Sequence, residues 1–276
     1  MNGQFSRLLS EGTLGGLRLR NRIIVPPMVR NYADTEGIVN KRVIDHYSSL
    51  AKGGAAMVIV EASYVHDNGK GFYQQIGIHN DKCIPGLNYL ADSIKEWGAK
   101  AAIQLYHAGR QTSESVTGAP VVAPSAIACP VSGGEPVDMS QHEVAEMVES
   151  FARAAKRAQT AGFDCVEIHA AHGYLISQFL SPHTNKRTDK YGGDEEKRFQ
   201  FLKEIVERTR QVCGKDYPMI VRINADDYVE GGIKPDDAGR YAKKLQDLNV
   251  DALSITVGMY ECLLNIRTTS PFGIGS

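Results

Sequence analysis

The sequence predicts an α/β fold, a TIM (β/α)₈-type barrel that is truncated after its sixth strand. Three observations support this prediction. The chain has 276 residues, close to the ~250 residues of one such barrel. Short apolar runs rich in Val and Ile alternate with longer amphipathic segments, a pattern typical of parallel strands covered by helices on both faces. Polar residues follow these runs, at the end of the strands where such barrels carry their chemistry.

Six short apolar runs are expected to form the strands. A glycine-containing segment, GTLGGLRLRNR at residues 12–22, precedes the first run and predicts a small hairpin that closes the bottom of the barrel. The expected strands are Ile23–Val25, Ala56–Val60, Ala101–Leu105, Cys165–Ile168, Met219–Ile223 and Ala252–Thr256.

Five amphipathic segments between these strands are expected to form helices. The third opens with Ser140 and Glu143, the spacing of a capping box. The last has Pro235 at its start, where proline is favoured. The expected helices are Val43–Lys52, Ile84–Trp97, Ser140–Ala161, Glu195–Cys213 and Pro235–Leu248.

The connections and the end of the chain depart from a simple barrel. Two connections, His107–Ser140 and Gly173–Asp194, are long enough to suggest a function. We treat residues 1–276 as one domain that lacks its seventh and eighth βα units. Because such a sheet would have two open edges, we expect a fragment of a longer chain. The alternative is closure by a second copy, as a homo-oligomer.

Composition and charge exclude several classes of partner. The 31 basic and 32 acidic residues give a formal net charge of −1, so nucleic acid and anionic membranes are not expected partners. The five cysteines are dispersed, with no CxxC pair, which fits a reducing compartment. No apolar leader or spanning segment is evident. We therefore expect a soluble cytoplasmic protein.

Two histidines leave the fourth strand together. His169 and His172 are three residues apart and are followed by Tyr174. The pair could ligate a metal, but no matched third ligand such as an HExxH helix is present. It could instead donate two hydrogen bonds to one oxygen and stabilise charge there. A purely structural role is the alternative, which the position at a strand end disfavours.

A glutamine and an arginine lie within other strands. Gln104 has both a donor and an acceptor, so it could bond the polar edge of a planar heterocycle or a neighbouring backbone group. Arg222 lies within an apolar run and needs a negative partner there. It could form a buried ion pair with Glu61 or Glu167, or hold a positive charge beside a cofactor that becomes anionic.

Four segments of this sequence resemble the Old Yellow Enzyme family of NAD(P)H:flavin oxidoreductases. The resemblance covers the chain through the sixth strand. It implies an eightfold barrel with FMN at the carboxyl ends of its strands and the FMN phosphate on units seven and eight. The segments are PPM at Pro26–Met28, IQLYHAGR at Ile103–Arg110, the stretch Glu167–Gly193 and VRINADDYVEGG at Val221–Gly232.

The resemblance also implies roles at the flavin. Pro27, Met28 and Ala62 would line the flavin, largely through their backbone. Gln104 would bond its pyrimidine edge, and Arg222 would lie where negative charge collects on reduction. No metal is implied at this site. One departure is Val29, which follows Met28 where family members often carry Cys or Thr.

The implied reaction is reduction of an activated C=C bond. NADH or NADPH would deliver hydride to FMN, which would pass it to an α,β-unsaturated carbonyl compound. His169 and His172 would bind the carbonyl oxygen of this substrate, and Tyr174 would protonate its α-carbon.

Two alternatives to a self-contained reductase are kept, and a third is disfavoured. The chain could be the first barrel of a larger flavoenzyme resembling dienoyl-CoA reductases, with a 4Fe-4S cluster and FAD on further domains. It could be an inactive barrel that serves only as a binding module. A flavin-free lyase or aldolase is disfavoured, because no Schiff-base lysine follows a strand.

Overall fold

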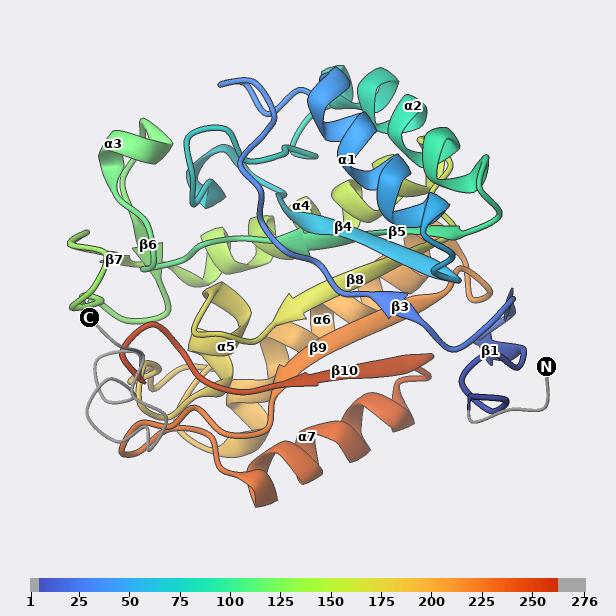
Figure 1. The fold of residues 1–276 in the computed structure, drawn as a ribbon. Helices are drawn as coiled ribbons and strands as arrows, with labels where there is room; N and C mark the ends of the chain where they lie inside the picture. Colours follow the sequence, from blue (N-terminus) through green and yellow to red (C-terminus); the bar gives the residue numbers. More distant parts are fainter. Residues whose placement is uncertain (1–4, 263–276) are drawn as a thin grey trace, which may run out of the picture.

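The computed structural model describes residues 5–262, whose main body is a curled sheet of six parallel strands (Figure 1). The sheet follows chain order from one edge to the other, as the strands of a TIM barrel do, so the predicted fold class is confirmed. The expected loss of two further units concerns the chain near Ser276, outside the described residues. The strands are β3 (Ile24–Val25), β4 (Met57–Tyr64), β5 (Lys100–Tyr106), β8 (Cys165–Ala170), β9 (Met219–Asn224) and β10 (Ala252–Thr256).

Five long helices alternate with these strands and cover the outer face of the sheet (Figure 1). The predicted capping box is present, since the Ser140 hydroxyl accepts from Glu143 N and the Glu143 carboxylate accepts from Ser140 N. Among residues 5–262, no helix combines the length and apolarity needed to cross a bilayer. The helices are α1 (Lys41–Lys52), α2 (Ile84–Lys95), α4 (Gln141–Thr160), α6 (Glu195–Cys213) and α7 (Pro235–Asp247).

The predicted hairpin covers the inner face of the sheet near the amino ends of its strands. It consists of β1 (Gly12–Leu14) and β2 (Leu17–Leu19), paired antiparallel. Gly15 lies in the turn at φ +53°, a left-handed conformation that favours glycine. Leu14 and Leu19 pack into a cluster with inward side chains of four strands. This cluster leaves the opposite, carboxyl end of the sheet for polar groups.

Alternation along the strands separates apolar from polar side chains. On β5, Ala101, Ile103 and Leu105 pack in the main core beneath the helices. The intervening Gln104 and Tyr106 lie on the inner face, because successive side chains of a strand point to opposite sides. The same alternation places polar side chains of β8, β9 and β10 on the inner face, where they gather near the carboxyl end.

The connections between the predicted elements contain more regular structure than the sequence predicts. The helix α5 was missed because it has only six residues, too few for a helical apolar pattern to repeat. Strand β4 continues past its predicted end at Val60. The sequence did not reveal this continuation, because a register shift between Val60 and Ser63 interrupts the apolar pattern. The additional elements are η1 (Asp67–Gly69), η2 (Asp81–Cys83), α3 (Glu114–Thr117), β6 (Val122–Ala123), β7 (Val137–Asp138) and α5 (Leu175–Leu180).

Candidate active site

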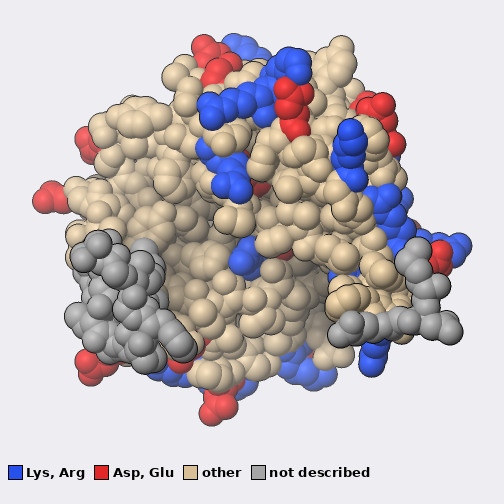
Figure 2. All heavy atoms as spheres, viewed as in Figure 1, with Lys and Arg blue, Asp and Glu red and all other residues tan. Residues whose placement is uncertain are grey.

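The residues predicted for the site lie near the carboxyl ends of their strands or on the segments that follow. Strand register brings several of them together, since Arg222 pairs with His169 and Gln104 pairs with Glu167. Figure 2 shows this part of the molecule hollowed at its centre, with mostly uncharged atoms around a basic side chain.

The predicted histidine pair forms a chain of hydrogen bonds. His169 Nδ1 accepts from Ala171 N at 3.3 Å, so its Nε2 carries the proton of the neutral ring. That Nε2 lies 3.3 Å from His172 Nδ1, and His172 Nε2 lies 2.8 Å from the Thr256 hydroxyl. The two imidazoles therefore present consecutive donors along one line. Among the described residues, no three His, Cys, Asp or Glu side chains group as a metal site requires.

The backbone of His172 is held in an unusual conformation. Its φ is +58°, in the left-handed region that non-glycine residues rarely adopt. The Asn224 side chain accepts from His172 N at 3.0 Å, and the Gln111 amide donates to the His172 carbonyl at 3.0 Å. These two hydrogen bonds offset the cost of the strained backbone and fix the backbone position from which the imidazole extends.

Burial keeps both histidines neutral. It lowers the pKa of His169 well below its usual range, with smaller contributions from His172 and the Arg222 charge. Burial and then the Arg222 charge lower the pKa of His172 to about 4. At neutral pH each ring therefore carries one N–H and no charge, a state suited to hydrogen bonding a carbonyl oxygen.

Tyr174 joins the histidines through an aromatic cluster. Its ring centroid is 5.0 Å from that of His169 and 4.5 Å from that of Tyr106, and its hydroxyl lies 3.0 Å from the Tyr260 hydroxyl. Burial raises the pKa of Tyr174 well above its usual 10. The phenol therefore keeps its proton at neutral pH, as a proton donor must.

Gln104 bonds a buried carboxylate, and the charge of Arg222 acts on the same carboxylate. The Gln104 amide donates to Glu167 Oε1 at 2.6 Å. Burial raises the pKa of Glu167 to about 7, although the Arg222 charge opposes this shift. Among the described residues, the buried Arg222 Nε has no hydrogen-bond partner. Glu61 is engaged elsewhere, accepting from Arg30 N at 2.5 Å and from the Tyr47 hydroxyl at 3.2 Å.

These observations fit a planar heterocycle with polar edges. An amide on one strand and a guanidinium with an unsatisfied N–H on another face the same interior. An unpartnered buried N–H costs free energy unless a bound group accepts from it. Gln104 and Arg222 therefore suit the hydrogen-bonding edge and the developing negative charge of a flavin.

The remaining three predicted residues lie on β4 and after β3. Ala62 is buried in the cluster that contains Tyr174, and Val29 packs against the same cluster. Pro27 and Met28 precede Val29, and the Met28 side chain is 59% exposed. The hydrogen bond from Arg30 N to Glu61 ties this segment to β4 beside Ala62.

A small cavity of about 240 Å³ adjoins His172 and Tyr174. Sequence reasoning missed most of its lining, because the segment after β10 has no apolar pattern and none of the quoted motifs covers it. The signal available was its position after a strand end. The lining consists of His172, Tyr174, Tyr228, Val257, Gly258, Met259, Tyr260 and Cys262.

The sequence pattern of the NADH:flavin oxidoreductase / NADH oxidase family matches residues 12–272. Curated relatives agree with this match. The NADH oxidase of Thermoanaerobacter brockii is 41% identical over 98% of this chain and 42% of its own length. The metal reductase of Desulforamulus reducens is 44% identical, over 93% of this chain and 38% of its own. The chain thus spans about two fifths of these two relatives.

A shorter relative and two solved structures extend the likeness. The NADPH dehydrogenase of Clostridium acetobutylicum is 41% identical over 91% of this chain and 74% of its own. A complex of 2-naphthoyl-CoA reductase has a TM-score of 0.91 at 34% identity, covering 94% of this chain and 41% of that one. Morphinone reductase with tetrahydroNAD has a TM-score of 0.82 at 29% identity, with coverages of 90% and 73%.

Proposed function

The chain belongs to the NADH:flavin oxidoreductase / NADH oxidase family, and from this we propose that it is an FMN-dependent NAD(P)H oxidoreductase of the ene-reductase type. Its substrates would be α,β-unsaturated carbonyl compounds, reduced at their activated C=C bond. One observation carries the proposal. Two neutral histidines, a protonated tyrosine and a guanidinium with an unsatisfied N–H lie within one group of strand ends.

Five residues of this chain would hold FMN. Gln104 would exchange its hydrogen bond to Glu167 for one to the polar edge of the ring system. The Arg222 guanidinium would supply a positive charge and an N–H donor that has no partner within residues 5–262. Pro27, Met28 and Ala62 would border the ring. Bound FMN would take hydride from NADH or NADPH and pass it to the β-carbon of the substrate.

His169 and His172 would bind and polarise the substrate. A carbonyl oxygen between the rings would accept from His169 Nε2, in place of the bond between the rings. It would also accept from His172 Nδ1 when the Thr256 hydroxyl donates to His172 Nε2, because the single proton of that neutral ring then lies on Nδ1. These donors stabilise the negative charge that develops on the oxygen, and they make the β-carbon more electrophilic. Because both pKa values are lowered, this polarisation needs no protonated imidazole.

Tyr174 would complete the reaction by donating its proton to the α-carbon. Its raised pKa keeps the hydroxyl protonated until the α-carbon becomes basic enough to take the proton. The apolar surroundings of the ring exclude water that would otherwise compete as the proton source.

A second candidate is the first barrel of a larger enzyme with a 4Fe-4S cluster and FAD on further domains. Its support is that the chain covers only 42% of the NADH oxidase and 41% of the 2-naphthoyl-CoA reductase chain. In that case the substrate would be an unsaturated acyl-CoA thioester, whose carbonyl oxygen would meet the same two histidines.

Flavin binding tests the proposal at its first step. The purified chain mixed with FMN and desalted should stay yellow, lose the flavin absorbance on anaerobic addition of NADH or NADPH, and regain it on addition of 2-cyclohexenone. Colourless protein would favour the inactive barrel. Protein that is reduced but regains its absorbance only with an unsaturated acyl-CoA would favour the larger enzyme.

The role of the histidines is tested by His169→Ala. We expect the reoxidation of the reduced protein by 2-cyclohexenone to slow by roughly 10²–10³-fold, the usual cost of losing one such donor. Reduction by NADH or NADPH should keep its rate. His142→Ala is the matched control, because His142 is an exposed histidine on α4. Reoxidation at the wild-type rate would rule out the assigned role.

A further inference from the structure

We propose that Tyr260 is a proton-relay residue that restores the Tyr174 proton after each turnover, and that Glu261 is the positioning residue that holds Tyr260 in place. This inference rests on the proposed function of Tyr174 as the proton donor. Neither Tyr260 nor Glu261 belongs to the motifs from which that function was inferred.

Tyr260 is the more exposed of the two tyrosines beside Tyr174. The Tyr174 side chain is buried, so direct exchange with water is restricted. Tyr106, on one side, is fully buried, and its hydroxyl has no hydrogen-bond partner among the described residues. Tyr260, on the other side, is partly exposed and lines the cavity, and its hydroxyl lies 3.0 Å from that of Tyr174. Tyr174 also borders this cavity but is only 8% exposed, so Tyr260 is the better placed of the two phenols to exchange its proton with solvent.

The contact between the two phenols allows the transfer. Burial raises the pKa of both, so each keeps its proton at neutral pH. A Tyr174 phenolate left beside the protonated Tyr260 hydroxyl would take its proton across the 3.0 Å contact.

The steps of the relay balance in protons and electrons. The Tyr174 O–H bond breaks as its proton forms a C–H bond at the substrate α-carbon, leaving a phenolate. That phenolate takes the Tyr260 proton across the 3.0 Å contact. The Tyr260 phenolate then takes a proton from a water molecule, which leaves hydroxide to the buffer. No electrons move in these proton transfers.

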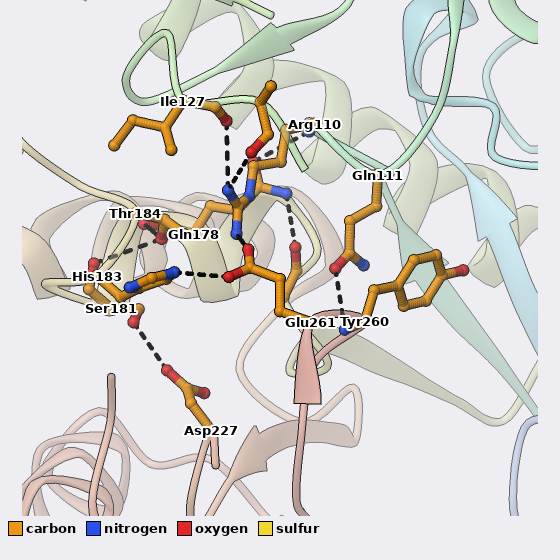
Figure 3. Close-up of polar contacts among 12 residues, drawn as sticks. Arg110, Gln111, Ile127, Gln178, Ser181, His183, Thr184, Asp227, Tyr260 and Glu261 are labelled. Carbon is orange, nitrogen blue, oxygen red and sulfur yellow. Dashed lines mark hydrogen bonds and ion pairs between the residues drawn. The ribbon is translucent and has the colours of Figure 1, made fainter. Parts of the chain in front are cut away.

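An ion-pair cluster fixes the residue next to Tyr260 (Figure 3). The Glu261 carboxylate accepts from the Arg110 guanidinium through one oxygen and from His183 Nε2 at 2.9 Å through the other. Arg110 is 1% exposed and also donates to the carbonyls of Ile127 and Ala128, at 3.3 and 3.0 Å. Glu261 therefore joins the segment after β10 to both long connections.

Gln111 links the backbone of Tyr260 to the histidine segment. Its Oε1 accepts from Tyr260 N at 3.4 Å (Figure 3). Its Nε2 donates to the His172 carbonyl at 3.0 Å. One amide side chain thus fixes the position of the Tyr260 backbone relative to the segment that carries His172 and Tyr174. Together with the Glu261 cluster, it determines where the Tyr260 hydroxyl lies.

The relay is tested by Tyr260→Phe in the FMN-loaded protein. Stopped-flow absorbance measures separately the reduction by NADH or NADPH and the reoxidation by 2-cyclohexenone. We expect steady-state reduction of 2-cyclohexenone by NADPH to slow by about tenfold, because Tyr174 must regain its proton before each further turnover. This loss is smaller than the roughly 10²–10⁴-fold that a general acid itself contributes. A single reoxidation should keep its rate, because it uses the proton that Tyr174 already holds. Reduction by NADH or NADPH should be unchanged. Tyr89→Phe, which removes an exposed hydroxyl on α2, should leave these rates at the wild-type value.

A readout that needs no turnover is the ¹³C NMR shift of the labelled Tyr174 Cζ atom. It should move in Tyr260→Phe, because Tyr174 loses its hydrogen-bond partner, and it should move in the same direction in Glu261→Gln. An unchanged Tyr174 shift in Tyr260→Phe would overturn the relay. Circular dichroism of each variant identifies any loss of folding. His183→Gln breaks one side of the Glu261 cluster and replaces Glu261→Gln if the latter fails to fold.

The positioning role of Glu261 is tested by a double-mutant cycle. If Glu261 acts through Tyr260, Glu261→Gln should slow steady-state turnover in the wild-type background and add nothing in the Tyr260→Phe background. Additive losses would overturn the positioning role. Steady-state turnover of 2-cyclohexenone at the same rate in the wild type and in Tyr260→Phe would overturn the relay alone. A wild-type protein that 2-cyclohexenone fails to reoxidise would overturn the proposed function and the relay with it.

Discussion

At the scale of single residues, burial sets the protonation states on which the candidate site depends. It keeps His169 and His172 neutral and Tyr174 protonated. It also raises the pKa of Glu167 to about 7. A hydrogen-bond donor, a proton donor and a titrating carboxyl thus share one interior. The same desolvation produces each state, although the chemical consequence differs from group to group.

The raised pKa of Glu167 predicts a pH-dependent stability. The folded protein binds this proton more tightly than the unfolded chain, whose pKa is near 4.5. The stabilisation is therefore complete below about pH 4.5 and is lost as the pH rises through about 7. We expect Glu167→Gln to remove this loss, so that urea unfolding at about pH 5 and about pH 8 differs less than in the wild type.

Glu135→Gln, which neutralises an exposed carboxyl, is the control for that measurement. It should keep the wild-type dependence on pH. A dependence equally steep in Glu167→Gln would show that Glu167 does not titrate in this range.

Sequence reasoning at this scale succeeded where a residue type was conspicuous in its setting. An arginine within an apolar strand and two histidines leaving another strand drew attention without any structure. Tyr260 and Glu261 drew none, because a tyrosine and a glutamate in a connection are ordinary. Their relation to Tyr174 and Arg110 depends on contacts across 86 and 151 positions of the chain. No local pattern encodes such contacts.

At the scale of elements, local rules predicted the long helices and the central strands. Apolar spacing and caps act within a few residues, so the sequence alone reveals them. The short helix α5 and the end of β4 escaped these rules. Their positions depend on packing against distant segments, which α5 shows by being buried along its whole length.

The capping box at the start of α4 gives a prediction at this scale. Ser140 Oγ accepts from Glu143 N at 3.2 Å, and the Glu143 carboxylate accepts from Ser140 N at 2.7 Å. We expect Ser140→Ala to lower the free energy of unfolding by about 1 kcal/mol, measured by urea denaturation. Ser115→Ala is the control, because Ser115 is an exposed serine inside the short helix α3 and is not the N-cap of a helix. A change in the Ser140 variant no larger than in this control would contradict the role of the cap.

At the scale of the whole molecule, the alternation of strands and helices was enough to predict the order of the sheet. Right-handed crossover connections leave few alternatives once six strands and five helices are placed. The closure of the sheet is a different matter, because it depends on chain outside the described residues. Within them β10 pairs with β9 alone. The β10 side chains Leu253 and Ile255 are 36% and 57% exposed, and Val257, which follows the strand, is 45% exposed.

This exposed apolar face predicts self-association of the 276-residue chain. Edge strands with apolar side chains pair readily with other copies. We expect sedimentation to show a mass that rises with protein concentration, and Ile255→Lys to reduce that rise. Val137→Lys, which places the same charge at an exposed valine of β7, should not do so. A concentration-independent mass for the wild type would contradict the prediction.

The left-handed backbone of His172 has a practical consequence for redesign. Asn224 and Gln111 bind the main chain of this residue, at its N–H and its carbonyl, whereas its imidazole contacts His169 and Thr256. The two main-chain hydrogen bonds would therefore remain if the imidazole were replaced. Asparagine tolerates the same dihedral angles better than most residues, so His172→Asn would install a shorter amide at this point without rebuilding the loop. The choice of donor could then be varied independently of the fold.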